Sequence, residues 1–367
     1  MENDTDKPGE LSELRHQIDA LDAKILALLN QRAAVAQSVG EQKKKSGAAV
    51  FRPEREAQVL KALTEQNHGP LKNGHVAAIY REVMSACRDL ERTTVVAYLG
   101  PVGTFSELAV AARFGSSVKG LPCASINEIF RSVEAQKADF GVVPLENSSE
   151  GAIGQTLDLL LATPLSLCAE VALRIEHQLL TGTGTLSGVE RVAAHPQALA
   201  QCTGWLQANA PLLVQVSASS NAEAARLAAA DATLAAIAGA KAAEAYGLVA
   251  VAKQIQDDPQ NTTRFGVIGR NKTEPSGHDR TSLALSVTNR SGAVYDMLAP
   301  LKAHGVSMTR FESRPARTGD WTYYFFIDIA GHAKDPAVSL ALADLKALAG
   351  FYKVLGAYPV AEGLHHD

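Results

Sequence analysis

The stretch ELRHQIDALDAKILALLNQR at residues 13–32 decides how the chain begins to fold. Around it, apolar residues recur at alternating spacings of three and four, the heptad seam of a long helix that packs against another helix. The seam consists of Leu11, Leu14, Ile18, Leu21, Ile25 and Leu28. Continuing the same count places Arg32 on the seam. Because a buried guanidinium is costly unless it is paired, the pattern indicates a charged site within a helical domain.

A second cation, Lys43, faces the same space as Arg32. It follows eleven residues later, which is about 20° around an α-helix. Alternatively, both side chains only reach solvent from the ends of their apolar stems. A helix over residues 11–43 would be about 50 Å long, more than a domain of this size buries alone. This length favours a partner helix from a second copy that closes a pocket around the cations.

Two shorter helices are predicted to follow, and both carry charges. Arg55 and Glu56 lie at the start of the first, and Cys87 with either Leu90 or Glu91 lies on the apolar stripe of the second. Cations and carboxylates without a nucleophile or a metal-ligand cluster indicate a site for a small dicarboxylate.

Residues 11–92 resemble the all-helical chorismate mutases, whose three-helix chains intertwine as dimers. The first helix, VGEQK at 39–43 and PERE at 53–56 carry the resemblance. It implies the pericyclic conversion of chorismate to prephenate, which requires cations on two carboxylates and a donor to the ether oxygen. By position, the resemblance implies that the two carboxylates are held by Arg32, Arg55 and Arg15 of the partner chain. Lys43 would donate to the ether oxygen, and Glu56 would bind the substrate hydroxyl.

Three positions of this segment vary within the family or depart from it. Arg52 stands where some relatives have an acid, and Cys87 where some have a serine that contacts substrate. Glu91 stands where the family has Gln or Glu. Because a glutamate donates a hydrogen bond only when protonated, mutase activity is expected to decline as pH rises.

Residues 94–272 alternate short apolar strands with Ala-rich helices, which predicts an α/β fold. Polar clusters lie at the ends of the predicted strands: GPVGTFS at 100–106, PLENSSEG at 144–151, HPQAL at 195–199 and NTTRFGVIG at 261–269. Each alone is typical of a turn or a helix cap. The segment has neither GxGxxG nor GK[ST], which argues against a nucleotide site.

Together the four clusters resemble prephenate dehydratase. The resemblance implies a two-lobed fold like that of type II periplasmic binding proteins, a site in the cleft between lobes, and no cofactor. It implies that prephenate loses carbon dioxide and hydroxide there, with Thr263 most closely tied to catalysis. The implied substrate-binding residues are Thr104, Ser106, Glu146, Asn147, Ser148, Gln197 and Arg264.

A polar linker at 271–279 precedes a segment patterned as βαββαβ, a two-layer α+β module. NRSGAVYDML at 289–298 and FESRP at 311–315 make this segment resemble an ACT domain. On pattern alone, NRSGAVYDML is the start of a helix and FESRP is a strand edge that carries charge. The resemblance implies L-phenylalanine as an allosteric inhibitor, bound by Asn289, Gly292, Ala293, Glu312, Ser313 and Arg314.

The whole chain is thus expected to form three domains, at 1–93, 94–272 and 280–362. A formal net charge of −4 over 367 residues favours neither nucleic acid nor an anionic membrane as partner. The polar start lacks the pattern of a signal peptide. The four cysteines match no disulfide or zinc spacing, so no metal site is expected and the thiols are expected to be buried and reduced. These features predict a cytoplasmic homodimer or larger homo-oligomer.

The competing hypothesis is an amino-acid-sensing regulatory protein with inactive enzyme domains. It would explain the polar clusters as ligand contacts. It gives no reason for Arg32, Lys43 and Glu91 along helical seams, nor for an intact NTTRF.

Overall fold

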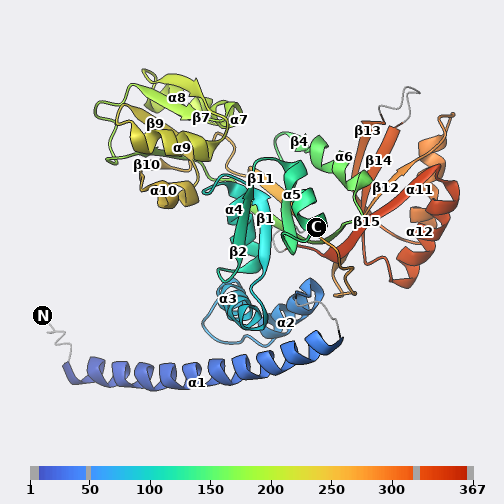
Figure 1. Ribbon diagram of the computed structural model, residues 1–367, viewed down its shortest axis with the longest axis horizontal. Coiled ribbons are helices and arrows are strands. Elements are labelled where there is room, and N and C mark those ends of the chain that lie inside the picture. The colour runs from blue at the N-terminus through green and yellow to red at the C-terminus, as the bar shows by residue number, and fades with distance from the viewer. Residues whose placement is uncertain (1–7, 47–50, 317–322, 362–367) are drawn as a thin grey trace, which may run out of the picture.

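The computed structural model describes residues 8–46, 51–316 and 323–361. A helical N-terminal part, a two-lobed α/β part and an α+β C-terminal part follow one another along the chain (Figure 1). Among the described helices, none has the length and apolar character needed to cross a membrane. Cys87, Cys123, Cys168 and Cys202 are buried free thiols, which confirms the expectation for the cysteines.

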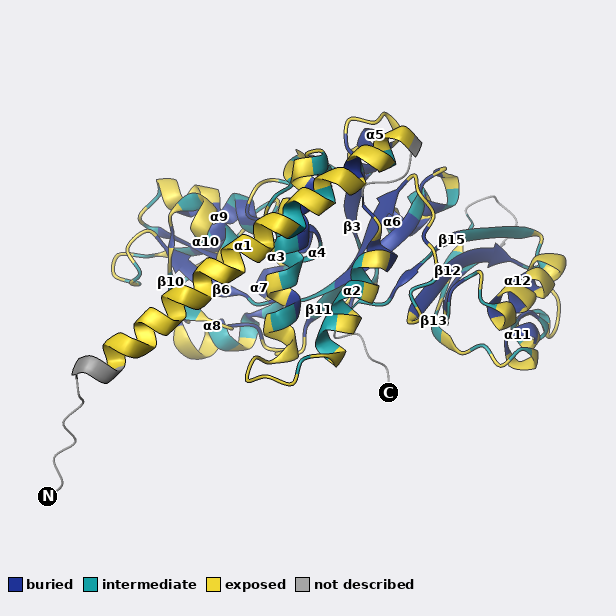
Figure 2. Cartoon of the chain, turned by 90° about the horizontal axis from the view of Figure 1, so that it is seen from below, coloured by how far each residue is buried: buried dark blue, intermediate teal, exposed yellow. Residues whose placement is uncertain are grey.

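The N-terminal part consists of α1 (Pro8–Ser46), α2 (Pro53–Glu65) and α3 (Asn73–Glu91). Helix α1 runs past α3 and its N-terminal half extends beyond the rest of the chain (Figure 1). Its apolar seam is uncovered, since the side chains from Leu11 at 47% to Leu28 at 63% are all exposed to solvent (Figure 2). A single chain therefore does not bury the heptad seam that its sequence encodes.

The middle part is divided between two sheets. The first lobe contains β1 (Val95–Leu99), α4 (Phe105–Phe114), β2 (Lys119–Cys123), α5 (Ile126–Glu134), β3 (Phe140–Asn147), β4 (Gly151–Ala152), α6 (Gly154–Ala162), β5 (Ser166–Arg174) and β11 (Thr262–Gly269). The second lobe contains β6 (Gln178–Thr181), β7 (Arg191–Ala194), α7 (Pro196–Gln201), α8 (Thr203–Asn209), β8 (Val214–Ser217), α9 (Asn221–Ala230), β9 (Leu234–Ala238), α10 (Ala240–Tyr246) and β10 (Val249–Lys253).

Strand order explains how the two lobes meet. The first lobe has the order β5-β11-β3-β1-β2 and the second the order β10-β6-β9-β7-β8. The chain crosses between them twice, after β5 and before β11. Helices α4, α5 and α9 each begin with a Ser or Thr N-cap three residues before a glutamate whose backbone N–H it accepts, as in a capping box.

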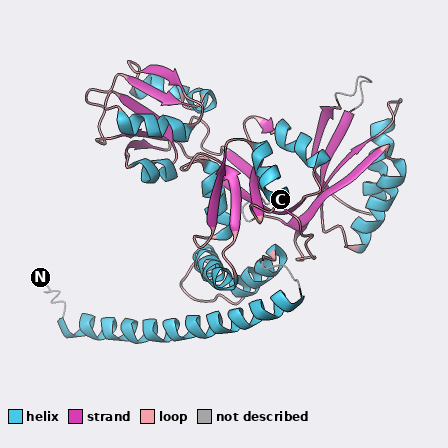
Figure 3. Cartoon of the chain, viewed as in Figure 1, coloured by secondary structure: helices cyan, strands magenta, loops and turns pink. Residues whose placement is uncertain are grey.

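The C-terminal module comprises β12 (Asp279–Ser286), α11 (Ala293–Ala303), β13 (Met308–Pro315), β14 (Tyr323–Ala330), α12 (Pro336–Leu348) and β15 (Phe351–Pro359). This order is the predicted βαββαβ arrangement. Figure 3 shows its sheet continuing into that of the first lobe, where β15 lies beside β5 and Gly356 pairs with Leu167. A Cβ at Gly356 would collide with the Leu167 carbonyl oxygen, so glycine permits this junction.

Candidate active sites

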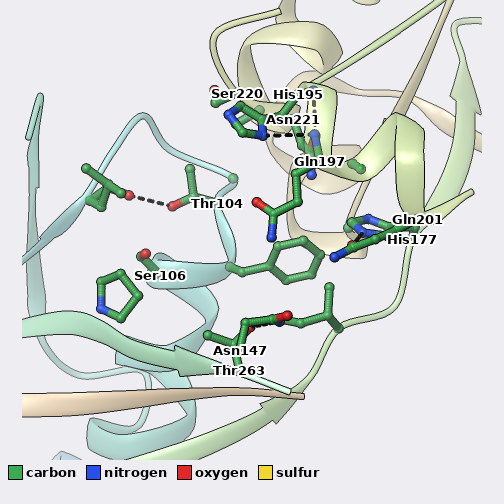
Figure 4. A pocket seen from close by; sticks show the side chains of 18 of the residues that line it. Thr104, Ser106, Asn147, His177, His195, Gln197, Gln201, Ser220, Asn221 and Thr263 are labelled. Carbon is green, nitrogen blue, oxygen red and sulfur yellow. Dashed lines mark hydrogen bonds between the residues drawn. The ribbon is translucent and has the colours of Figure 1, made fainter. Parts of the chain in front are cut away.

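A cavity of about 310 Å³ lies between the two lobes and is lined by both. Five of the predicted dehydratase residues line it: Thr104, Ser106, Asn147, Gln197 and Thr263. In Figure 4, Thr104 and Ser106 come from the start of α4, Asn147 and Thr263 from β3 and β11, and Gln197 reaches in from α7. Four clusters spread over about 160 residues of sequence thus meet at one place.

The hydroxyl of Thr263 is oriented by Asn147. The two residues are paired across antiparallel strands, and Asn147 Nδ2 donates to Thr263 Oγ1 at 2.9 Å. The backbone N–H of Ser149 donates to Asn147 Oδ1 at 3.0 Å, which fixes which way the amide points. Because Thr263 Oγ1 accepts one hydrogen bond in this way, its own proton is left to donate to a ligand.

Three polar residues that were not among the predicted site residues extend this contact into the second lobe: Asn261 and His177, which are buried, and the partly buried Gln201. Asn147 Nδ2 also donates to Asn261 Oδ1 at 2.8 Å, and Asn261 Nδ2 donates to Gln201 Oε1 at 3.1 Å. His177 Nε2 lies 3.1 Å from the same Gln201 oxygen. The chain of hydrogen bonds crosses the cleft beside both connections between the lobes, so it links their relative position to Thr263.

The charge state of His177 follows from its surroundings. Its side chain is buried, and burial lowers its pKa below the ordinary value, an effect opposed by the hydrogen bond from His177 Nε2 to Gln201 Oε1. Neutral imidazole that donates from Nε2 carries its free lone pair on Nδ1, and among the described residues that atom has no hydrogen-bond partner. His177 thus enters the site as a neutral group.

The cleft offers partial positive charge without basic side chains. None of the described lining residues is Lys, Arg, Asp or Glu. Instead, the N-cap residues of four helices line it: Thr104 of α4, His195 of α7, Ser220 of α9 and Gly239 of α10. Free N–H groups at helix N-termini favour anions, so this cavity suits a carboxylate-bearing ligand.

The structure does not bring every predicted dehydratase residue into the cleft. Glu146, Ser148 and Arg264 line a different cavity of about 240 Å³ on the other side of the sheet. They adjoin Asn147 and Thr263 in sequence, and successive side chains of a strand point to opposite faces. The structure therefore places these three residues outside the interlobe cleft.

In the helical part, two predicted contacts form between α1 and α3. Arg32 Nη1 donates to Cys87 Sγ at 3.0 Å, and Lys43 Nζ lies 3.3 Å from Glu91 Oε2. Of the two candidates for the end of the α3 stripe, Glu91 is the residue that faces α1, whereas Leu90 is 52% exposed. Four of the predicted mutase residues thus form one cluster.

The other three mutase residues lie apart from this cluster in a single chain. Arg15 precedes Arg32 by 17 residues on the same helix, a separation of about 26 Å. Arg55 is exposed. Glu56 forms ion pairs with Arg88 of α3 and with Arg113 of α4, the latter at 3.1 Å, so it points toward the first lobe. The Glu56 carboxylate is thus engaged by two cations of the same chain, and its predicted contact with a substrate hydroxyl stays a prediction.

The predicted effector residues separate into two groups. Asn289, Gly292 and Ala293 line a cavity of about 690 Å³ at the start of α11. The FESRP residues Glu312, Ser313 and Arg314 do not line it. Arg314 instead forms an ion pair with Asp158 of α6 at 3.3 Å, across the junction with the first lobe. Over the described residues, no group of three or more His, Cys, Asp or Glu side chains is placed to hold a metal ion.

Comparison with known proteins agrees with this division of the chain. Residues 14–92 match the family model of chorismate mutase type II, and residues 96–273 match that of prephenate dehydratase. Two kinds of catalytic segment, a helical isomerase and a two-lobed lyase, are therefore joined in one polypeptide.

Similar proteins carry the same pair of segments or the second alone. A bifunctional chorismate mutase/prephenate dehydratase from Neisseria gonorrhoeae is 50% identical over 350 residues, covering 95% of this chain and 96% of that protein. A prephenate dehydratase from Arthrobacter aurescens, solved in complex with L-Phe, has 33% identity and a TM-score of 0.68, covering 73% of this chain and 90% of that one. A solved quorum-quenching acylase has 30% identity and a TM-score of 0.67, covering 73% and 98%. This chain belongs to the family of bifunctional chorismate mutase/prephenate dehydratases.

Proposed function

We propose that the chain makes phenylpyruvate for phenylalanine biosynthesis in two steps at two sites. Chorismate rearranges to prephenate at the α1–α3 cluster, and prephenate loses carbon dioxide and water in the interlobe cleft. The observation that carries the second assignment is the Asn147–Thr263 hydrogen bond at 2.9 Å inside a cavity lined without charged side chains among the described residues.

The cleft suits the dehydratase chemistry. In prephenate the bond between the ring and its carboxylate breaks, the electron pair moves into the ring, and the hydroxyl leaves with a proton, so no oxidant or reductant is needed. A poorly solvated carboxylate is closer to losing carbon dioxide, and a cavity without a pairing guanidinium leaves it so. Thr263 Oγ, held by Asn147, donates to the departing hydroxyl. The helix N-termini bind the second carboxylate.

The mutase step requires two chains. Pairing the exposed seam of α1 with that of a second copy buries its apolar side chains, at about 25 cal/mol per Å². An intertwined pair also carries the partner's Arg15 to the cluster of Arg32 and Lys43, where it supplies the cation that one chain places about 26 Å away. In such a homodimer, Lys43 donates to the ether oxygen of chorismate and the guanidiniums hold its carboxylates.

The C-terminal module is assigned as an ACT-type effector domain for L-phenylalanine. The cavity at Gly292 supports this, because Gly292 has φ = 77° and opens an eleven-residue helix whose first N–H groups suit an amino-acid carboxylate. The related Arthrobacter aurescens enzyme was solved in complex with L-Phe. In this assignment phenylalanine inhibits the dehydratase by favouring one arrangement of paired modules. The chain acts in the cytoplasm.

One experiment tests the assignment of both activities. Purified chain is supplied with chorismate, and chorismate, prephenate and phenylpyruvate are followed separately over time. Transient prephenate followed by phenylpyruvate is expected, and added L-phenylalanine should slow only the second step. Binding of phenylalanine without turnover of either substrate would favour the sensor hypothesis instead.

A further inference from the structure

Strands β3 and β11 present their neighbouring residues to opposite sides of one sheet. In the register of the pair, Thr263 lies opposite Asn147 and Arg264 lies opposite Glu146. The first pair lines the interlobe cleft, and the second pair lines the cavity of about 240 Å³ on the side of the C-terminal module. A displacement of either strand that moves one pair therefore moves the other as well.

Arg264 ties β11 to the C-terminal module through a buried network. Its Nη1 lies 2.6 Å from Asp328 Oδ2 of β14, and its Nη2 donates to the Tyr358 hydroxyl of β15 at 2.9 Å. Its Nε donates to Glu170 of β5 at 2.7 Å. Ser282 of β12 contacts both Asp328 and Tyr358. A guanidinium that is fully paired with groups of several strands holds its own strand in place.

Electrostatics keep this network ionised. Burial alone would raise the pKa of Asp328, but the guanidiniums of Arg264 and Arg310 hold it below its ordinary value. Burial raises the pKa of Tyr358 to about 12, so that it remains a hydroxyl. Breaking one partner of such a buried set is costly, which makes Arg264 the fixed part of the junction.

Glu146 forms the looser part of the same junction. Its Oε2 lies 2.7 Å from Arg310 Nε of β13 and 3.7 Å from Arg264 Nη1. The Glu146 side chain is 34% exposed, whereas that of Arg264 is 9% exposed. Because the Glu146 carboxylate is partly solvated and adjoins a cavity, the contact with Arg310 is able to open without unpairing the buried network.

We propose that Arg264 and Glu146 are positioning residues through which the C-terminal module sets the placement of Thr263 and Asn147, with Arg310 as the releasable contact. Neither residue touches prephenate. A shift of β13 when an effector binds the module changes the Arg310–Glu146 contact and so moves the neighbouring cleft residue Asn147. Coupling between two ligand sites is typically about 5–150-fold in affinity. This proposal rests on the assigned dehydratase activity and effector.

The junction also contains a contact that serves as a matched control. Lys353 of β15 donates to the carbonyl oxygens at the end of α6, at 2.7 Å to Leu160 and 3.1 Å to Leu161. It joins the C-terminal module to the first lobe as Arg310 does, yet its hydrogen bonds go to the end of α6 and not to β3 or β11. Deleting the module is less informative, because it would leave Arg264 without Asp328 and Tyr358.

The test compares Arg310→Met, Arg310→Lys and Lys353→Met in the full-length chain. Dehydratase kcat and KM, mutase activity, L-phenylalanine binding by calorimetry and inhibition by L-phenylalanine are measured for each. For Arg310→Met, dehydratase kcat is expected to fall about tenfold, with KM and mutase activity within about twofold. The factor of inhibition should shrink at least about fivefold while phenylalanine still binds. Arg310→Lys should restore most of the dehydratase kcat and most of the inhibition by phenylalanine. Lys353→Met should resemble wild type in both measurements.

Two results would overturn the proposal. One is unchanged kcat and inhibition in Arg310→Met, and the other is equal loss in Lys353→Met, which would assign the effect to docking of the module in general. If Arg310→Met does not fold, Glu146→Gln replaces it in the test, because this substitution removes the same ion pair at its more exposed partner. A wild-type enzyme insensitive to phenylalanine would refute the assigned effector, and kcat of the Arg310 variants would then decide the positioning role alone.

Discussion

The interlobe cleft and the α1–α3 cluster differ in how much of each site one chain supplies. In the cleft, Asn147, Thr263 and Gln201 are already joined by hydrogen bonds across the two lobes. In the cluster, Arg32 contacts Cys87 and Lys43 pairs with Glu91, but α1 leaves its apolar seam exposed. Strands and short helices from both lobes of one chain meet in the cleft, whereas the seam of α1 is left without a covering element among the described residues.

The difference also concerns charge. The cleft presents hydroxyls, amides and helix N-termini, and its buried His177 is neutral. The cluster presents an ammonium and a guanidinium, each in contact with a side chain of α3. This matches two kinds of chemistry, because losing carbon dioxide benefits from a poorly solvated carboxylate and a rearrangement benefits from carboxylates held firmly.

The largest expected effect comes from removing one hydroxyl, which should impair the dehydratase and not the mutase. Thr263→Ala should lower dehydratase kcat by about 10³-fold, since a donor aimed at the leaving group is lost, and leave mutase activity unchanged. Thr262→Ala is the matched control, because this neighbour on the same strand lines the opposite cavity. It should stay within about threefold of wild type. Steady-state assays with prephenate and with chorismate measure both, and near-normal turnover by Thr263→Ala would refute the site.

The next effect tests whether the mutase alone depends on pairing of chains. Ile18→Glu combined with Ile25→Glu places carboxylates on the exposed seam of α1. Mutase kcat/KM should fall about 100-fold because the partner's Arg15 is lost, while dehydratase activity on prephenate stays within about threefold. Light scattering reports the oligomeric state. Leu212→Glu, at a residue 91% exposed and far from α1, is the control and should change neither activity.

The sequence predicted the three-part architecture and the centre of the cleft, but not the orientation of every motif residue. Thr263 and Asn147 were predicted from the resemblance of their motifs to those of prephenate dehydratase, and both line the interlobe cavity. Arg264 and Glu146 were assigned to the same cleft, although adjacent residues of a strand face opposite sides. Applying that period of two to each motif would have separated them without a structure.

Other misses have different causes. Gln201 lies four residues after Gln197 on α7, so the helical period alone places both on one face. His177 gave no local signal, because its partners Gln201 and Gln256 are distant in sequence. Glu56 faces Arg113, which is 57 residues away and in another domain. Contacts of that kind are set by tertiary packing, and no periodicity reveals them.

A smaller effect concerns the protonation of Glu91 in the mutase cluster. Glu91→Gln supplies an amide that donates at every pH, whereas the carboxylate paired with Lys43 must first gain a proton. The ratio of variant to wild-type mutase activity should therefore rise with pH. Glu65→Gln, at an exposed pair with Lys61, is the control and should give a constant ratio. Parallel pH profiles for wild type and Glu91→Gln would remove Glu91 from the mechanism.

The smallest effect is on the stability of the cleft. Burial holds the pKa of His177 below its unfolded value of about 6.5, so the unfolded chain binds the extra proton first as pH falls. The contribution of neutral His177 is complete above that value and is lost as the pH falls through the folded pKa. His177→Gln cannot gain a proton, so its Tm should decline less than that of wild type between pH 7 and 5.

Each 1 kcal/mol is about 2–4 °C for domains of this class, so the two thermal melting curves need to be compared at matched pH values. The exposed His68 provides the control, because His68→Gln should follow wild type at every pH. Equal pH dependence in wild type and His177→Gln would mean that the cleft accommodates a charged imidazole. In that case the cleft, like the mutase cluster, would be able to hold a charged side chain, and the two sites would not differ in this respect.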